Sequence, residues 1–134
     1  MRILIASHGN YALGLRDAAY KLSGSRINID AIACYVDDTP IQDLFDRYLK
    51  GSEEKWVILT DMLGGSVNQY AIQNCCSDQF HVISGVNLFI LLRILEIEDD
   101  SDLDSQINEI MLENHSQNAY VNELLKDRRD LWAK

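Results

Sequence analysis

A histidine and an aspartate each follow directly after an apolar segment, and their side chains could act together. His8 follows the apolar residues 2–7, and an ordinary imidazole, with a pKa of about 6.5, is largely a neutral nucleophile at pH 7. Asp61 follows residues 56–60, and a carboxylate beside an imidazole fixes its tautomer and stabilises a positively charged or modified ring. Taken alone, either residue could equally be a turn residue at the end of a strand.

A glycine-rich segment three residues after Asp61 could bind an anion. Gly64 and Gly65 allow the backbone to approach a ligand, free N–H groups at a helix N-terminus bind anions, and Ser66 adds a hydroxyl donor. The segment matches neither GxGxxG nor GxxxxGK[ST], so it predicts no nucleotide site, and its alternative is a tight turn capped by Ser66. Together with His8 and Asp61, the segment favours transfer of a phosphoryl group through histidine.

The segments that must position these residues alternate between strands and helices. Apolar and β-branched runs predict four strands, over residues 2–7, 29–36, 56–60 and 80–84. Apolar residues at helical spacing predict five helices, over residues 15–22, 40–50, 66–76, 88–95 and 103–111. The order of these elements predicts an α/β fold, an open and mostly parallel sheet flanked by helices, with one antiparallel edge strand as an option.

Local signals predict how several helices begin. Thr39 is expected to cap the second helix, with Pro40 in its first turn and Gln42 completing a capping box. Ser101 is expected to cap the fifth helix. The fourth helix is apolar on nearly all sides, which predicts that it is buried. Residues 119–125 fit a short strand or a further helix equally well.

The polar segments that follow the predicted strands converge in space. They are Ser7-His8-Gly9, Asp37-Asp38, Asp61 with its glycines, and Gly85-Val86-Asn87. In open α/β sheets, ligands bind beyond the carboxyl ends of the strands. The fold therefore brings the candidate chemical groups to the edge of the sheet where active sites form.

Composition limits the classes of partner. The chain has 134 residues, which predicts a single domain over residues 1–134, and a formal net charge of −9. This charge argues against nucleic acid and anionic membranes and favours a protein partner with a basic docking face. The three cysteines are expected to be reduced, and the longest apolar stretch, residues 82–94, is too short to span a membrane. We expect a cytoplasmic protein.

Other candidate chemical groups are weaker. His81 and His115 show no metal-ligand spacing, so no metal site is predicted. Asp37 and Asp38 could hold Mg²⁺, but a solvated turn is the favoured interpretation. Cys34 lies within a predicted strand, which is a poor place for a reactive thiol.

Three motifs together resemble a known family. A first strand that ends in Ser7-His8-Gly9, a third strand that ends in the D-x-x-GGS of residues 61–66, and a later Gly85-Val86-Asn87 are similar to the mannose-type IIA component of the bacterial phosphoenolpyruvate-dependent sugar phosphotransferase system. The likeness extends from residue 2 to about residue 110. Each motif is short, but the three occur in the family's order and at plausible distances.

The resemblance implies a phosphohistidine carrier, a phosphotransferase component that is usually a homodimer. His8 would accept a phosphoryl group from the phosphocarrier protein HPr and pass it to a histidine of a IIB component, which phosphorylates the incoming sugar. The membrane components IIC and IID would be indirect partners. Asp61 would bond the active histidine, Ser66 would lie near the phosphoryl group, and the three glycines Gly9, Gly64 and Gly65 would help to bind it. No cofactor, nucleotide or metal is implied.

The sequence departs from the family pattern at two places and leaves alternatives open. The family often has proline after GGS, where this chain has Val67-Asn68, and proline soon after GVN, where it has residues 88–90 (Leu-Phe-Ile). One alternative is the related phosphotransfer subunit of a dihydroxyacetone kinase. Another is a regulatory module of the same fold that uses His8 only as a sensor. Sugar specificity lies in the other components of such systems.

Overall fold

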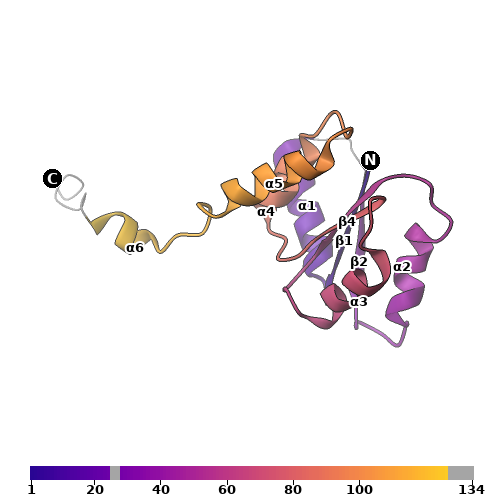
Figure 1. Cartoon of the computed structure of the whole chain (residues 1–134). Helices are drawn as coiled ribbons and strands as arrows, with labels where there is room; N and C mark the ends of the chain where they lie inside the picture. Colours follow the sequence, from indigo (N-terminus) through magenta and orange to yellow (C-terminus); the bar gives the residue numbers. More distant parts are fainter. Residues whose placement is uncertain (25–27, 127–134) are drawn as a thin grey trace.

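The sheet is open and entirely parallel. The structure, a computed structural model, describes residues 1–24 and 28–126. The four strands are β1 (Arg2–His8), β2 (Ile29–Cys34), β3 (Trp56–Thr60) and β4 (Phe80–Ile83). They lie in the order β2-β1-β3-β4, and each neighbouring pair runs parallel (Figure 1). The predicted fold class is confirmed, and no antiparallel strand joins the sheet within the described ranges.

Helices cover both faces of the sheet. In the described part of the chain they are α1 (Tyr11–Ser23), α2 (Ile41–Leu49), α3 (Ser66–Cys75), α4 (Leu88–Leu95), α5 (Leu103–Asn114) and α6 (Val121–Leu124). Helices α1, α4 and α5 contribute to the apolar core on one face, and α2 and α3 to the core on the other. The short α6 lies away from the sheet at the end of an extended segment (Figure 1). Residues 119–125 therefore follow the helical alternative.

Alternate side chains of the central strands serve the two cores. Ile3 and Ile5 of β1 pack toward α1 and α4, whereas Leu4 and Ala6 pack toward α2 and α3. All four side chains are fully buried, because helices cover both sides of the sheet. This double coverage explains why the strands appear in the sequence as continuous apolar runs. The predicted burial of α4 is confirmed as well, since Ile90, Leu91, Ile94 and Leu95 are buried and its other apolar side chains are partly buried.

Two helix starts differ from their predictions. Thr39 does not cap α2, because Pro40 occupies the cap position, without a side-chain hydrogen bond. The Thr39 backbone N–H instead donates to the Asp37 carboxylate at 2.8 Å. Thr39 therefore belongs to the turn that Asp37 stabilises, and not to the start of α2 as the sequence pattern predicted. The cap of α5 is Asp102 rather than Ser101, the residue before it.

Strand β2 is two residues shorter than predicted. Tyr35 has φ 63°, in the left-handed region, and it is the only non-glycine residue with a positive φ in the described ranges. A left-handed residue leaves the extended conformation of a strand, so the parallel pairing ends with His8 opposite Cys34. The apolar pattern through residue 36 gives no sign of this break.

The topology reverses direction between β1 and β3. The chain leaves β1 through α1 on one face and reaches β2 at one edge, then returns through α2 on the opposite face to place β3 on the other side of β1. The carboxyl ends of β1 and β3 therefore form a topological switch point, where open α/β folds bind ligands. His8 ends β1, and Asp61 directly follows β3.

Candidate active site

His8 and Asp61 meet at this switch point. One carboxylate oxygen of Asp61, Oδ2, accepts hydrogen bonds from the His8 backbone N–H at 2.7 Å and from the His8 ring at 2.8 Å, through Nδ1. A carboxylate cannot donate, so Nδ1 carries the proton and the lone pair of the neutral ring lies on Nε2. The His8 side chain is 48% exposed and that of Asp61 16% exposed. The site therefore presents an oriented, accessible imidazole nitrogen above a largely covered carboxylate.

The pKa of the Asp61 carboxyl reflects opposing effects. Burial disfavours its charged form and by itself raises the pKa. The hydrogen bonds from the His8 backbone N–H and ring, together with attraction to the ring, outweigh burial and lower the pKa of Asp61 below its usual value. The carboxylate is therefore charged at neutral pH and can stabilise positive charge on the imidazole.

Ser66 faces the other ring nitrogen of His8. Its Oγ lies 3.0 Å from His8 Nε2, and since that nitrogen bears the lone pair, the serine hydroxyl donates to it. Ser66 is the first residue of α3, so the positive end of this helix lies beside Nε2. In the described part of the chain no acceptor binds the backbone N–H groups of Ser66 and Val67. This helix end has the donors and the dipole that bind an anion.

The two glycines before α3 shape the loop that reaches His8. Gly64 has φ 81°, a conformation that glycine adopts without strain. A Cβ atom at Gly65 would lie 3.2 Å from the Met62 carbonyl oxygen and 3.6 Å from His8 Cε1, so the absence of a side chain permits the close approach. The Gly65 N–H donates to that same carbonyl at 3.0 Å. A side chain at Gly65 would therefore crowd the Met62 carbonyl of this loop beside the His8 ring.

A buried asparagine that the sequence analysis did not assign to the site holds this loop. The side-chain oxygen of Asn68 accepts from the Gly64 N–H at 3.1 Å, and its amide donates to the Thr60 hydroxyl at 2.8 Å. Asn68 and Thr60 are fully buried, so the bond between their side chains forms away from water, whereas the bond to Gly64 is partly buried. The sequence feature that could have identified Asn68 is its polar side chain among the otherwise apolar buried residues of α3. Asn68 thereby connects the end of β3 to the loop that carries the glycines.

The turn after β1 is fixed on two sides. Gly9 adopts φ 57°, and its N–H donates to the Cys34 carbonyl at 2.9 Å. The buried Ser7 hydroxyl accepts from the Ala12 N–H at 2.8 Å at the start of α1. Cys34 itself is fully buried, and burial followed by the nearby charge of Asp61 raises the pKa of its thiol to about 11. The structure thus agrees with the sequence in giving Cys34 no reactive thiolate.

The third motif, residues 85–87, forms hydrogen bonds with the segments at the ends of neighbouring strands. The Val86 N–H donates to the Thr60 carbonyl at 2.9 Å, and its own carbonyl accepts from the Tyr11 hydroxyl at 2.7 Å. Asn87 caps α4 by accepting from the Ile90 N–H at 2.9 Å. These bonds link the segments after β1, β3 and β4. The motif therefore holds the ends of these strands together and starts α4.

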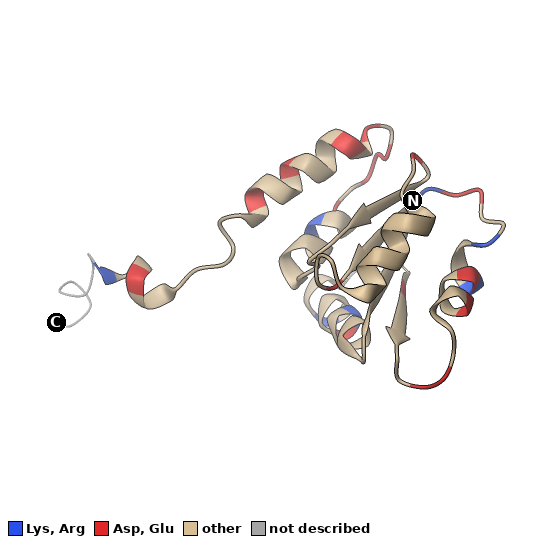
Figure 2. Cartoon of the chain, turned by 60° about the horizontal axis from the view of Figure 1, so that its bottom comes forward, with Lys and Arg blue, Asp and Glu red and all other residues tan. Residues whose placement is uncertain are grey.

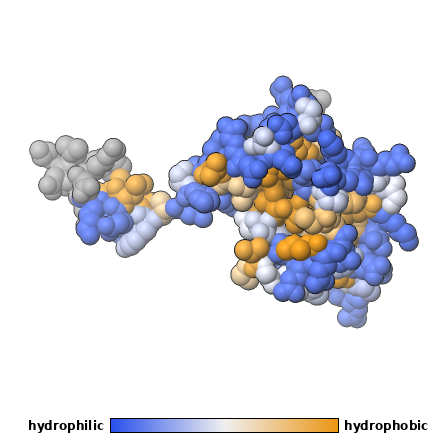
Figure 3. Space-filling model, in the orientation of Figure 1, coloured by the Kyte–Doolittle hydropathy of each residue, from blue (hydrophilic) through white to orange (hydrophobic). Residues whose placement is uncertain are grey.

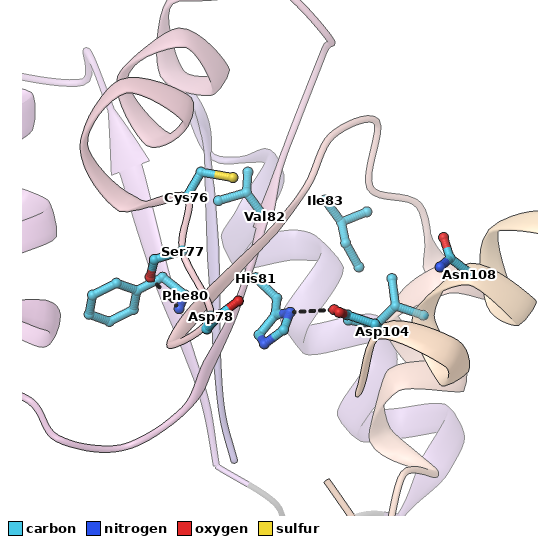
Figure 4. A pocket seen from close by; sticks show the side chains of 10 residues that line it. Cys76, Ser77, Asp78, Phe80, His81, Val82, Ile83, Asp104 and Asn108 are labelled. Atoms are coloured by element: carbon cyan, nitrogen blue, oxygen red, sulfur yellow. Dashed lines mark hydrogen bonds and ion pairs between the residues drawn. The ribbon is translucent and has the colours of Figure 1, made fainter. Parts of the chain in front are cut away.

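His81, the next histidine along the chain, lies in a separate cavity. A cavity of about 250 Å³ opens beside β4 and α5, where His81 Nδ1 lies 3.4 Å from an Asp104 carboxylate oxygen (Figure 4). Apolar side chains gather across the middle of the face that carries β4 (Figure 3). Neither His8 nor Asp61 lines this cavity. In the ranges that the structure describes, no three His, Cys, Asp or Glu side chains are grouped as a metal site would require.

The surroundings of His8 combine apolar and acidic side chains. Met62 and Leu63, in the loop after Asp61, are largely exposed. The loop after β2 carries two exposed acidic residues, Asp37 and Asp38 (Figure 2). Contiguous exposed apolar patches are typical of protein docking surfaces.

The fold and the site together define an α/β domain with an oriented, partly exposed histidine at the carboxyl edge of its sheet. The chain belongs to the EIIA-man family, described as the PTS system fructose IIA component, whose model matches residues 2–111. It is thus a IIA component of the sugar phosphotransferase system (PTS), with a general role in phosphotransfer. This finding confirms the resemblance drawn from the three motifs.

Solved structures share the fold. A Klebsiella pneumoniae protein assigned as a phosphoenolpyruvate-dependent sugar PTS permease has a TM-score of 0.84 at 22% identity, covering 92% of this chain and 93% of its own. The PTS IIA protein associated with the fucose utilization operon of Streptococcus pneumoniae has a TM-score of 0.72 at 25% identity, covering 92% and 95%. The mannose/sorbose-specific IIA subunit of Enterococcus faecalis has a TM-score of 0.70 at 18% identity, covering 88% and 92%.

No curated protein matches the sequence significantly. Within the described ranges, no helix has the length and apolar character needed to cross a membrane.

Proposed function

We propose that His8 is the phosphorylation site of this IIA component and that it carries a phosphoryl group from HPr to a IIB component. The lone pair of His8 Nε2 attacks the phosphorus of the phosphorylated donor. A new N–P bond forms while the bond between phosphorus and the donor breaks, and its electron pair leaves with the donor. The same exchange in the next step, with a IIB histidine as nucleophile, regenerates neutral His8.

The orientation of His8 carries this proposal. The bond from Nδ1 to Asp61, at 2.8 Å, leaves Nε2 as the nucleophilic atom and lets the carboxylate balance the positive charge of the phosphorylated ring. The Ser66 hydroxyl, at 3.0 Å from Nε2, can turn to donate to a phosphoryl oxygen. The N–H groups at the start of α3 add donors for the same group. Phosphoryl transfer depends mainly on such positioning and electrostatic stabilisation.

The three glycines contribute shape rather than free donors. The N–H groups of Gly9, Gly64 and Gly65 already donate to acceptors within the protein. Their proposed contribution to phosphoryl binding is therefore the close approach of the backbone, which leaves room for the group beside Nε2.

The surface around His8 supports protein partners. Exposed apolar side chains beside the ring can be covered by a docked protein, and the acidic residues after β2 favour a basic rim on that protein. HPr and a IIB component are the partners proposed for this surface, with IIC and IID reached only through IIB.

We also propose that residues 1–134 form a single domain that acts as a homodimer, which sedimentation at micromolar concentration would test.

The experiment is an intact-mass measurement after incubation with phosphoenolpyruvate, enzyme I and HPr. We expect one added phosphoryl group that is lost in acid and retained in base, as for a phosphohistidine, and no addition in His8→Ala. His81→Ala is the matched control, because it removes a histidine outside the site and should keep the added mass. Labelling of folded His8→Ala would contradict the assignment.

The second half of the reaction separates this proposal from its alternatives. Adding a IIB component should discharge the phosphorylated protein and move the phosphoryl group to IIB. Discharge only by a dihydroxyacetone kinase would favour the kinase subunit, and a stable phosphohistidine that no acceptor discharges would favour a regulatory module.

A further inference from the structure

A tyrosine that the motifs do not include packs against the active histidine. The rings of Tyr35 and His8 lie with their centroids 5.2 Å apart and their planes tilted by 34°. This separation is typical of interacting ring pairs. Tyr35 follows β2 directly, and the carbonyl of the preceding residue, Cys34, accepts the Gly9 N–H at 2.9 Å. The ring is therefore held beside the turn that carries His8.

The backbone of Tyr35 is strained, and core packing does not account for the strain. Its φ of 63° lies in a region that a large side chain rarely adopts. The Tyr35 side chain is 56% exposed, so the strained conformation gains little apolar burial. The position has tyrosine where glycine or asparagine would avoid the strain. The contact that this conformation does create is the one with the His8 ring.

We propose that Tyr35 is a positioning residue for phosphoryl transfer. It holds the His8 imidazole in the orientation in which the ring forms hydrogen bonds with Asp61 and Ser66. The inference deepens the proposed function and rests on it. The His8 ring is half exposed, so water can compete for its two hydrogen bonds, and a ring that loses them can rotate about its side-chain bonds. A ring packed on it restricts this rotation, while the two nitrogens keep their bonds to Asp61 and Ser66.

The test compares variants that separate the ring from the backbone. Tyr35→Asn removes the ring but tolerates the left-handed conformation, and Tyr35→Gly removes both ring and strain. Tyr35→Phe keeps the ring without its hydroxyl. Val36→Ala is the matched control, because Val36 is an exposed neighbour outside the contact with His8. Each variant is expected to fold, since the side chain of Tyr35 lies outside both apolar cores.

Two measurements are made on each variant. NMR of the unphosphorylated protein reads the His8 Nδ1–H signal, its exchange with water and the ring-current shift of the His8 carbon-bound protons. Rapid mixing with phosphorylated HPr then gives the maximal first-order rate of phosphoryl uptake, written here as kcat, and the concentration of phosphorylated HPr at half that rate, written as KM. For Tyr35→Asn we expect loss of the ring-current shift, faster Nδ1–H exchange and a kcat about two- to tenfold lower, the value of one aromatic contact, with KM unchanged. Tyr35→Phe and Val36→Ala should match the wild type.

Each other outcome overturns the inference in a distinct way. Unchanged His8 signals in Tyr35→Asn and Tyr35→Gly would mean that the ring does not orient His8. Altered signals with an unchanged kcat would mean that the orientation does not limit transfer. A raised KM with unchanged kcat would make Tyr35 a docking contact instead. If the wild type takes up no phosphoryl group, the proposed function fails, and the NMR result alone still decides whether Tyr35 orients His8.

Discussion

Replacing Asp61 with asparagine tests the electrostatic part of the site. The variant keeps the size of the side chain and an oxygen that can accept from His8, but it removes the negative charge. The ring of a phosphorylated imidazole that keeps its Nδ1 proton is positively charged, and Nδ1 lies 2.8 Å from Oδ2, which puts the charge centres about 4 Å apart. Such a pair interacts by about 1 kcal/mol in water and by about 4 kcal/mol at an effective dielectric constant of about 20. Since His8 is half exposed, we take about 2 kcal/mol, which is about 30-fold.

The assay is rapid mixing of Asp61→Asn with phosphorylated HPr. We expect the rate of phosphoryl uptake to fall about 30-fold while the mass of the product stays the same, because His8 still supplies the accepting nitrogen. Asp38→Asn is the matched control, since it removes the same charge from an exposed loop at the same edge of the sheet. It should alter KM at most. Equal rates for Asp61→Asn and the wild type would refute the charge-stabilising role of Asp61.

Three further predictions concern the support of the site. Gly65→Ala should slow phosphoryl uptake about three- to tenfold, because its Cβ must displace a backbone carbonyl 3.2 Å away beside His8, whereas Gly14→Ala, with open space around it, should match the wild type in uptake assays. Asn68→Ala should lower the free energy of unfolding by about 1–3 kcal/mol in urea titrations, because it leaves the Gly64 N–H without its acceptor. The folded protein lowers the pKa of Asp61, so the charged carboxylate stabilises the fold above the ordinary aspartate pKa, and this stability is lost as the pH falls through the pKa of the folded state. The difference in the free energy of unfolding between wild type and Asp61→Asn should therefore shrink on acidification, in urea titrations at decreasing pH.

The architecture of the site was predictable from the sequence because it follows from the core. Continuous apolar runs identified the buried parallel strands, and the residues after them identified the carboxyl edge of the sheet. His8 and Asp61 come together as expected, since they follow neighbouring central strands. The position of Ser66 beside His8 was expected as well, and its Oγ lies 3.0 Å from Nε2, whereas its part in phosphoryl transfer stays a prediction.

The parts of the site that sequence reasoning missed depend on single backbone conformations and buried polar bonds. Tyr35 continues an apolar, β-branched run, so its pattern predicts a strand, and nothing in the adjacent residues indicates the left-handed turn that aims its ring at His8. Asn68 was noticed only as a departure from the family pattern. Its function depends on the Thr60 hydroxyl and the Gly64 N–H lying within reach, which only the folded loop determines.

The position of Asp61 relative to His8 is set by the register of two strands rather than by the site itself. In the parallel pairing of β1 with β3, Ala6 lies opposite Thr60, so Asp61 comes one residue and His8 two residues beyond the last pair. A one-residue slip would turn every apolar side chain of β3 toward the opposite core and would move Asp61 away from the His8 N–H and ring. The burial of alternate side chains on both faces therefore stabilises the bond on which the chemistry depends. Core substitutions that preserve this register should leave the hydrogen bonds between His8 and Asp61 intact. Substitutions in the loops that carry Ser66 and Tyr35 can alter the contacts of the His8 ring without changing the register.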